Sequence, residues 1–216
     1  PVFDLARGQL LNTCRGGSDY TNALAFTPDG TGLVTVGNAR ALLWDVATGR
    51  PVFEFRHRRQ GDYTGYLTGA AVSPDGRRVA LTGMNTNTPD AAVTVTEFDP
   101  DRGVRLYRGL AGQVQRVWVS PTAKWVVGLS GDWHLAAWDR ATGRLAYAWS
   151  LTPGWTSDNA AVAVDEAAGA VYFASGTRAV RLNLATGRRD QAWALPLGQL
   201  DTLAVAADGR PRLVRR

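Results

Sequence analysis

The sequence has one cysteine, Cys14, and one methionine among its 216 residues. A single cysteine excludes an intrachain disulfide and a cysteine-based metal cluster, and it is typical of a reducing compartment. No apolar run reaches the roughly eighteen residues of a transmembrane helix. The opening residues Pro1-Val-Phe-Asp lack the basic start and apolar core of a signal peptide. We therefore expect a cytoplasmic protein that does not bind membranes.

Lysine is equally scarce, since Lys124 is the only lysine among 24 basic residues, and the net charge of +5 rests on arginine. The arginines are scattered through turns and strand ends, whereas a nucleic-acid-binding surface concentrates its charge on one stripe. This bias towards Arg, Ala, Gly and Val is typical of a GC-rich bacterial genome. Nucleic-acid binding through Arg56, Arg58, Arg59 and the tail 210–216 remains an alternative that the pattern disfavours.

Helical periodicity is nearly absent, and short β-rich runs separated by turn signals replace it. One phrase, Trp44-Asp45-Val-Ala-Thr-Gly49, returns as Trp138-Asp139-Arg-Ala-Thr-Gly143. A weaker copy ends at Gly187, and fainter ones lie at Phe3-Asp4 and Phe98-Asp99. A unit repeated at about forty residues indicates a repeat architecture.

A second phrase alternates with the first. It reads Thr27-Pro28-Asp29-Gly30, then Ser73-Pro74-Asp75-Gly76, and in weaker form Ser120-Pro121-Thr122-Ala123. Pro presets φ in such a turn and Gly accepts a positive φ, so each phrase predicts a tight turn between two strands. One period therefore contains four short strands, which predicts an all-β fold of four-stranded antiparallel sheets.

These phrases resemble the WD-repeat family, which is named for the dipeptide seen at Trp44-Asp45 and Trp138-Asp139. The resemblance covers nearly the whole chain and implies a β-propeller, in which four-stranded blades repeat around an axis. It departs from the family in one respect, because the Gly-His dipeptide that usually precedes a repeat is missing. The implied single domain, 1–216, divides into a half blade 1–14, blades 20–57, 67–108, 114–150 and 159–195, and a half blade 200–216.

The two half blades leave two arrangements open. The ends could pair and close a five-bladed ring, or the chain could be part of a longer propeller. The second arrangement is favoured, because the sequence starts without Met and stops within a strand.

No catalytic motif is found. The two histidines, His57 and His134, have no neighbours at metal-ligand spacing, so neither a metal nor another cofactor is expected. Asp45 and Asp139 belong to the turn phrase, where Asp satisfies backbone amides. The segment from Ala137 to Trp149 partly resembles the docking motif of quinoprotein propellers, which leaves a quinone-binding enzyme as an alternative. A non-enzymatic protein is the favoured interpretation.

The second blade carries two insertions, near residues 58–66 and 84–90. The strand order places both at the same face, and insertions that gather on one face of a repeat protein often mark its binding face. We expect a non-catalytic scaffold that binds a protein or peptide partner, within a larger bacterial regulatory protein. The candidate partner-binding residues are Arg58, Arg59, Tyr63, Tyr66, Asn85, Asn87, Trp133 and Trp155. The candidate structural residues are Trp44, Asp45, Gly49, Phe98, Asp99, Trp138, Asp139, Gly143 and Gly187.

Overall fold

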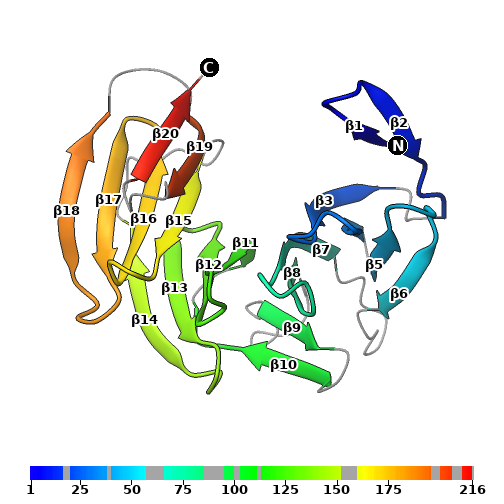
Figure 1. The fold of residues 1–216 in the computed structure, drawn as a ribbon. Coiled ribbons are helices and arrows are strands. Elements are labelled where there is room, and N and C mark those ends of the chain that lie inside the picture. Colours follow the sequence, from blue (N-terminus) through cyan, green and yellow to red (C-terminus); the bar gives the residue numbers. More distant parts are fainter. Residues whose placement is uncertain are drawn as a thin grey trace.

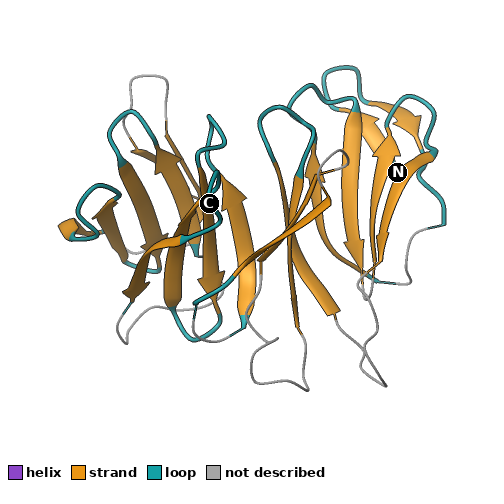
Figure 2. Cartoon of the chain, turned by 90° about the horizontal axis from the view of Figure 1, so that it is seen from below, coloured by secondary structure: helices purple, strands orange, loops and turns teal. Residues whose placement is uncertain are grey.

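The computed structural model of the chain is all-β. It describes residues 1–16, 20–37, 40–56, 66–84, 95–99, 103–110, 113–151, 160–195, 200–205 and 211–215. These residues form strands and turns, with no helix among them (Figures 1 and 2). The expected all-β class is therefore confirmed. Within these ranges no helix has the length and apolar character that crossing a membrane requires.

The strands form antiparallel sheets, which we name I to VI in chain order. Sheet I contains β1 (Val2–Asp4) and β2 (Gln9–Asn12), and sheet VI contains β19 (Leu200–Val205) and β20 (Pro211–Arg215). Sheet II contains β3 (Thr21–Phe26), β4 (Gly32–Gly37), β5 (Arg40–Asp45) and β6 (Pro51–Arg56). Sheet III contains β7 (Tyr66–Val72), β8 (Val79–Met84), β9 (Val95–Asp99) and β10 (Gly103–Tyr107). Sheet IV contains β11 (Val114–Val119), β12 (Trp125–Ser130), β13 (His134–Asp139) and β14 (Leu145–Ser150). Sheet V contains β15 (Ala161–Asp165), β16 (Ala170–Ser175), β17 (Arg178–Asn183) and β18 (Arg189–Ala194).

Sheets II to V have four strands each, hydrogen bonded in chain order, which confirms the expected four-stranded antiparallel unit. The sheets follow one another along an open arc (Figure 1). Sheets I and VI lie at the two ends of this arc and are separate two-stranded sheets. The ring closure that one sequence-based arrangement required is therefore not formed between the described strands. The propeller arrangement itself stays a prediction.

The Pro-Asp-Gly phrases form self-contained turns. In sheet II the hydroxyl of Thr27 donates to Asp29 at 2.5 Å, and Asp29 also accepts the amide of Thr31 at 3.0 Å. In sheet III the hydroxyl of Ser73 donates to Asp75 in the same way. The aspartate thus satisfies the donors that its own turn exposes, as Asp does in turns generally.

The third phrase has lost both Asp and Gly, and a neighbouring sheet supplies what is missing. Glu166, in the first turn of sheet V, accepts the hydroxyl of Ser120 and the amides of Thr122 and Lys124, the latter two at 2.8 and 3.3 Å. Ala123 adopts φ +59° where Gly30 has φ +72° in the first phrase. The turn at residues 120–124 therefore links sheet IV to sheet V.

The Asp-x-x-Thr-Gly turns are also linked to the preceding sheet. The carbonyl oxygen of the alanine in each turn accepts a hydrogen bond from the last strand of the sheet before it. The donors are Asn12 Nδ2 to Ala47 at 2.9 Å, Arg105 Nη1 to Ala141 at 2.8 Å and Tyr147 Oη to Ala185 at 2.8 Å. The repeated phrase therefore shapes a hairpin and also presents an acceptor to the neighbouring sheet.

The core lies between successive sheets rather than within one. The tryptophans of the repeated phrase are fully buried, Trp44 against Val2 of sheet I and Trp138 beside Tyr107 of sheet III. Between sheets IV and V the buried cluster is larger and includes Leu135, Phe173 and Leu182. This face-to-face packing brings the first strands of the sheets close to one another.

Candidate functional site

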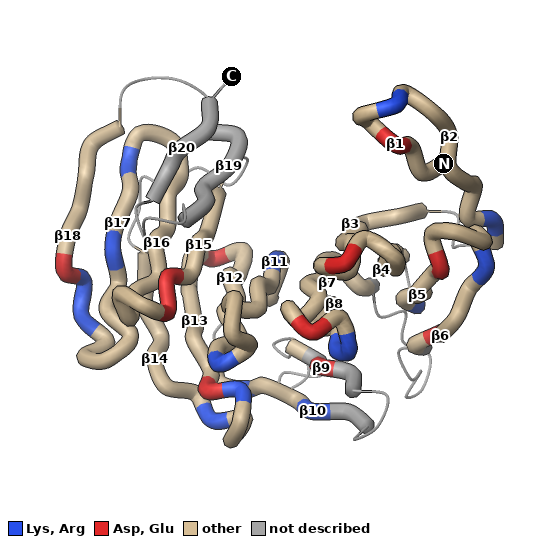
Figure 3. Tube along the Cα trace, viewed as in Figure 1, with Lys and Arg blue, Asp and Glu red and all other residues tan. Residues whose placement is uncertain are grey.

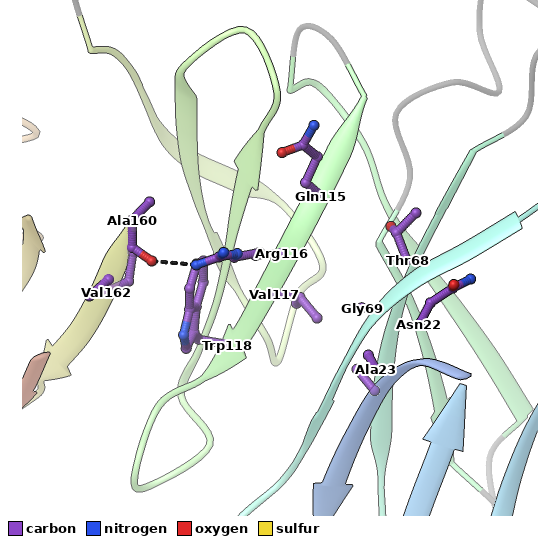
Figure 4. A pocket seen from close by; sticks show the side chains of 12 residues that line it. Asn22, Ala23, Thr68, Gly69, Gln115, Arg116, Val117, Trp118, Ala160 and Val162 are labelled. Atoms are coloured by element: carbon purple, nitrogen blue, oxygen red, sulfur yellow. Dashed lines mark hydrogen bonds between the residues drawn. The ribbon is translucent and has the colours of Figure 1, made fainter. Parts of the chain in front are cut away.

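The first strands of sheets II to V line one cavity of about 530 Å³ (Figure 4). Its lining comes from β3, β7, β11 and the beginning of β15, and includes Asn22, Thr68, Gln115, Arg116, Trp118 and Ala160. Each of these strands is an edge strand among the described residues, because it pairs on one side only. Its other edge offers backbone donors and acceptors that are not used by another strand.

The edge of the sheets at which the first and third strands begin is called the leading edge. Several lining residues, such as Asn22, Gln115 and Ala161, lie near it, whereas Val117 and Trp118 lie towards the end of β11. The turns of both repeated phrases lie at the opposite edge, which we call the turn edge. Tyr20, Trp133 and Arg178 also lie at the leading edge, directly before β3, β13 and at the start of β17. The predicted binding loops lie almost wholly outside the described residues.

A β-bulge recurs in the first strands and directs side chains across the cavity. Asn22 and Thr68 are the extra residues of bulges in β3 and β7. Asn22 Nδ2 donates to the carbonyl oxygen of Leu67 at 2.7 Å, and Thr68 Oγ1 donates to that of Val114 at 3.3 Å. A bulge re-aims a side chain, so it can join neighbouring strands that share no ladder. Sequence analysis missed these residues, because neither repeated phrase contains them.

Arg116 continues this series from β11. Its Nη1 donates to the carbonyl oxygen of Ala160, next to the start of β15 (Figure 4). Arg116 is the only charged residue among the described residues that line the cavity. In the described part of the chain its guanidinium pairs with no carboxylate. A guanidinium has five N–H donors, so most of them are available to a ligand.

Sheet IV contains a serine, an aspartate and a histidine in one turn, and their geometry argues against catalysis. The hydroxyl of Ser130 donates to Asp132 and accepts the backbone amide of His134 at 3.0 Å. His134 Nδ1 lies 3.2 Å from Asp132, not beside the serine hydroxyl. A serine nucleophile needs a base on its own hydroxyl, and here the imidazole does not provide one. The three residues stabilise a turn.

The electrostatics of Asp132 agree with that role. Partial burial acts to raise the pKa of Asp132, but the hydrogen bonds from Ser130 and His134 outweigh it and hold the pKa below its ordinary value. The carboxylate therefore stays ionised as an acceptor for its own turn.

A second polar cluster is buried between sheets III and IV. Glu97 accepts Nε and Nη2 of Arg140 at 2.9 and 2.7 Å and also accepts the hydroxyl of Tyr107. Burial, followed by the hydrogen bond to Glu97, raises the pKa of Tyr107. The cluster is closed off, since Glu97 and Tyr107 are 5% and 0% exposed, so it has no room for a substrate.

The predicted partner-binding residues fall largely outside the described residues. Those are Arg58, Arg59, Tyr63, Asn85, Asn87 and Trp155. Tyr66 begins β7, and its side chain is not among those described. Trp133 is half-buried, with its ring edge-on to Phe173 at 6.4 Å between the ring centres. Its backbone has φ +67°, an unusual conformation for a bulky residue.

Most of the candidate structural residues lie in the described part of the chain. Trp44 and Trp138 are buried, while Asp45 and Asp139 accept the amides of Thr48 and Thr142 at 2.7 and 2.8 Å. The three glycines Gly49, Gly143 and Gly187 have positive φ. Phe98 and Asp99 end β9, and their side chains are not among those described.

Trp149, which suggested the quinoprotein alternative, lies between sheets. It is buried, stacks on Tyr147 and donates from Nε1 to the carbonyl oxygen of Gly187 at 2.8 Å. Among the described residues no group of three or more His, Cys, Asp or Glu is arranged to hold a metal ion. No protein-family model matches the sequence, and no curated protein matches it significantly.

Proposed function

We propose that this chain forms a β-propeller, or part of one, of the WD-repeat type, and that it acts as a non-catalytic scaffold for a protein or peptide partner. The observation that carries the proposal is the common cavity lined by the first strands of four successive sheets. Innermost strands that surround a channel are the arrangement of propeller blades. The repeated phrases that resemble WD repeats support the same assignment.

A recognition role fits the chemistry of the described residues better than catalysis does. The serine, aspartate and histidine of sheet IV stabilise their own turn, and the buried Glu97 cluster has no access for a substrate. The leading edge instead offers a cavity and edge-strand backbone, features that bind extended peptides. The arginine-rich composition fits a GC-rich bacterial genome, and the resemblance to WD repeats suggests a module within a larger regulatory protein.

The charge distribution favours a protein partner over nucleic acid. Lys and Arg are spread over several sheets and alternate with Asp and Glu along the described trace (Figure 3). A nucleic-acid footprint would need a continuous basic stripe that follows the phosphate backbone.

Selection from a library of random displayed dodecapeptides, followed by hydrogen–deuterium exchange on the complex, tests this function. We expect enrichment of peptides that protect the leading edge, near the starts of β3, β7, β11 and β17. Arg178→Ala at the leading edge and Arg188→Ala at the turn edge of the same sheet are matched variants, and only the first should alter binding. Failure to enrich any peptide, or protection confined to the turn edge, would contradict the proposal.

A further inference from the structure

Arg116 stands out in the cavity because of its charge and its surroundings. The other described lining residues are neutral, and many of them are small, such as Ala23, Gly69 and Ala161. Small residues leave the space open, and Arg116 places a cation in it. An arginine that faces neutral walls and no carboxylate attracts an anionic group.

The hydrogen bond to Ala160 orients this cation rather than neutralising it. Nη1 of Arg116 donates to the carbonyl oxygen, which spans from β11 towards β15 (Figure 4). A guanidinium held at one nitrogen keeps its remaining fork for a second acceptor. A carboxylate matches this fork with two parallel hydrogen bonds.

The walls of the cavity favour a peptide as the source of that carboxylate. The first strands present edges that pair with no other described strand, and such edges can recognise an extended chain through main-chain hydrogen bonds. The volume of about 530 Å³ lies within the range of sites that enclose a ligand of several groups. A single arginine suits one acidic side chain, whereas nucleic acid needs several cations in a row.

We propose that Arg116 anchors an Asp or Glu side chain of a peptide that binds at the leading edge and reaches into this cavity. The inference rests on the proposed function and specifies the chemistry of its partner. The 216-residue chain is basic, with a net charge of +5, so an acidic partner also fits its charge.

The test compares peptide selection on the wild-type chain with selection on Arg116→Gln. The wild type should enrich dodecapeptides that contain Asp or Glu, and this enrichment should disappear in the variant. A fluorescein-labelled selected peptide with an amidated C-terminus should then bind Arg116→Gln about tenfold or more weakly by fluorescence anisotropy. Arg116→Lys keeps the charge but loses the fork, so it should give an intermediate affinity.

Arg144→Gln is the matched control, because Arg144 is exposed at the turn edge and the change in charge is the same. Replacing the acidic residue of the peptide with Asn or Gln should weaken binding as much as Arg116→Gln does. If a free C-terminal carboxylate alone sustains the affinity, the side-chain assignment is wrong. Equal losses in Arg116→Gln and Arg144→Gln would mean that only the total charge matters, and this would overturn the proposal.

The outcomes separate this inference from the proposed function. Peptides enriched without acidic residues would overturn the role of Arg116 and leave the scaffold function standing. No enriched peptide at all would contradict both. If a single-stranded oligonucleotide binds the chain and its binding depends on Arg116, the ligand of this cavity is nucleic acid and the peptide assignment is wrong. Thermal unfolding monitored by circular dichroism shows whether each variant is folded. If Arg116→Gln is unfolded, the comparison is made with Arg116→Lys instead.

Discussion

The hairpins that contain the repeated Trp-Asp phrase pack on two chemically different neighbouring sheets. In sheet II this hairpin packs on sheet I, where Val46, the residue after Asp45, lies in an apolar cluster with Val2. In sheet IV it packs on sheet III, where Arg140, the residue after Asp139, forms an ion pair with the buried Glu97. The same hairpin is therefore joined to its neighbour by apolar packing at the sheet I–II junction and by charge at the sheet III–IV junction.

The partners occupy equivalent positions. Val2 and Glu97 each stand directly before a Phe-Asp pair, so they are the same residue of the repeat. Between sheets IV and V the corresponding pair is Ala137 and Leu184, which belong to one buried cluster. The residue before the aromatic-Asp pair in one sheet and the residue after Asp or Asn in the next sheet therefore differ together. Both are apolar at the I–II and IV–V junctions, and both are charged at the III–IV junction.

This difference separates two roles within one phrase. Asp, Thr and Gly shape the hairpin, whereas the residue after Asp is matched to the adjacent sheet. A buried ion pair contributes little net stability against an apolar pair, but breaking it on one side is costly. We therefore expect Glu97 and Arg140 to specify which sheets join.

The largest effects should come from the two buried tryptophans. Trp44→Ala and Trp138→Ala should each lower the free energy of unfolding by about 3–5 kcal/mol. Trp138→Ala should cost more, because Trp138 Nε1 donates to the carbonyl oxygen of Arg108, directly after the last strand of sheet III, whereas Trp44 Nε1 donates to Thr35 within its own sheet. Urea denaturation measures both, and equal losses would show that the inter-sheet hydrogen bond adds nothing.

The ion pair gives the next largest effect. Arg140→Val should destabilise the chain by about 3 kcal/mol, because it removes the nearest cation from the buried Glu97 carboxylate and leaves only the Tyr107 hydroxyl and Arg78, whose Nε is 3.9 Å away. The double variant Glu97→Val and Arg140→Val copies the pair of the sheet I–II junction. It should recover part of that loss, because it removes the buried charge but leaves the Tyr107 hydroxyl without its acceptor. A double-mutant cycle by urea denaturation measures the coupling. Additive losses would mean that the two residues do not act as a pair.

The turn glycines distinguish the junctions by the space around them. Gly49 and Gly143 have φ +66° and +75°, and an Ala in this region costs about 1–2 kcal/mol. A Cβ at Gly49 would lie 2.6 Å from Asn12 Oδ1 and 3.1 Å from the Thr13 carbonyl oxygen, whereas at Gly143 the nearest atom, Arg105 Cδ, is 3.5 Å away. Gly49→Ala should therefore cost about 2–3 kcal/mol and Gly143→Ala about 1 kcal/mol. Thermal unfolding of both variants measures the two losses. An equal or larger loss in Gly143→Ala would contradict this order.

The turns and the four-stranded sheets could be predicted from the sequence because their signals are local. Pro28, Asp29 and Gly30 specify a turn whatever lies beside it, so the strands on either side follow. The substitution of Glu166 for a missing turn aspartate could not be predicted, because it depends on a residue 46 positions from Ser120. The Glu97–Arg140 pair has the same origin in the packing of neighbouring sheets.

The cavity was harder to predict than the sheets. Asn22, Thr68 and Arg116 share no residue type, and their common feature is a place near the start of a first strand, at or beside a bulge. Periodicity does not reveal a bulge, since the extra residue leaves the alternation on either side intact. The predicted binding loops lie almost wholly outside the described residues and stay a prediction.

The smallest difference between the junctions is expected at Asp45 and Asp139. Hydrogen bonds from the side chain and amide of Thr48 lower the pKa of Asp45, and those of Thr142 lower the pKa of Asp139. In sheet V Asn183 fills the same place and accepts the amides of Ala185 and Thr186 at 2.8 and 3.0 Å. Asp45→Asn and Asp139→Asn should therefore keep their turns and change Tm only slightly at neutral pH.

The pH dependence of these two variants completes the comparison. A carboxylate with a lowered pKa stabilises the folded state above its unfolded pKa of about 3.9, and this contribution is lost as the pH falls through the folded pKa. The difference in Tm between wild type and each variant should be constant above about pH 5 and should disappear in stronger acid. Each aspartate accepts hydrogen bonds from its own turn, so the two plots of Tm difference against pH should coincide. A larger effect for Asp139→Asn alone would mean that Lys124, whose charge also lowers the pKa of Asp139, contributes to the difference.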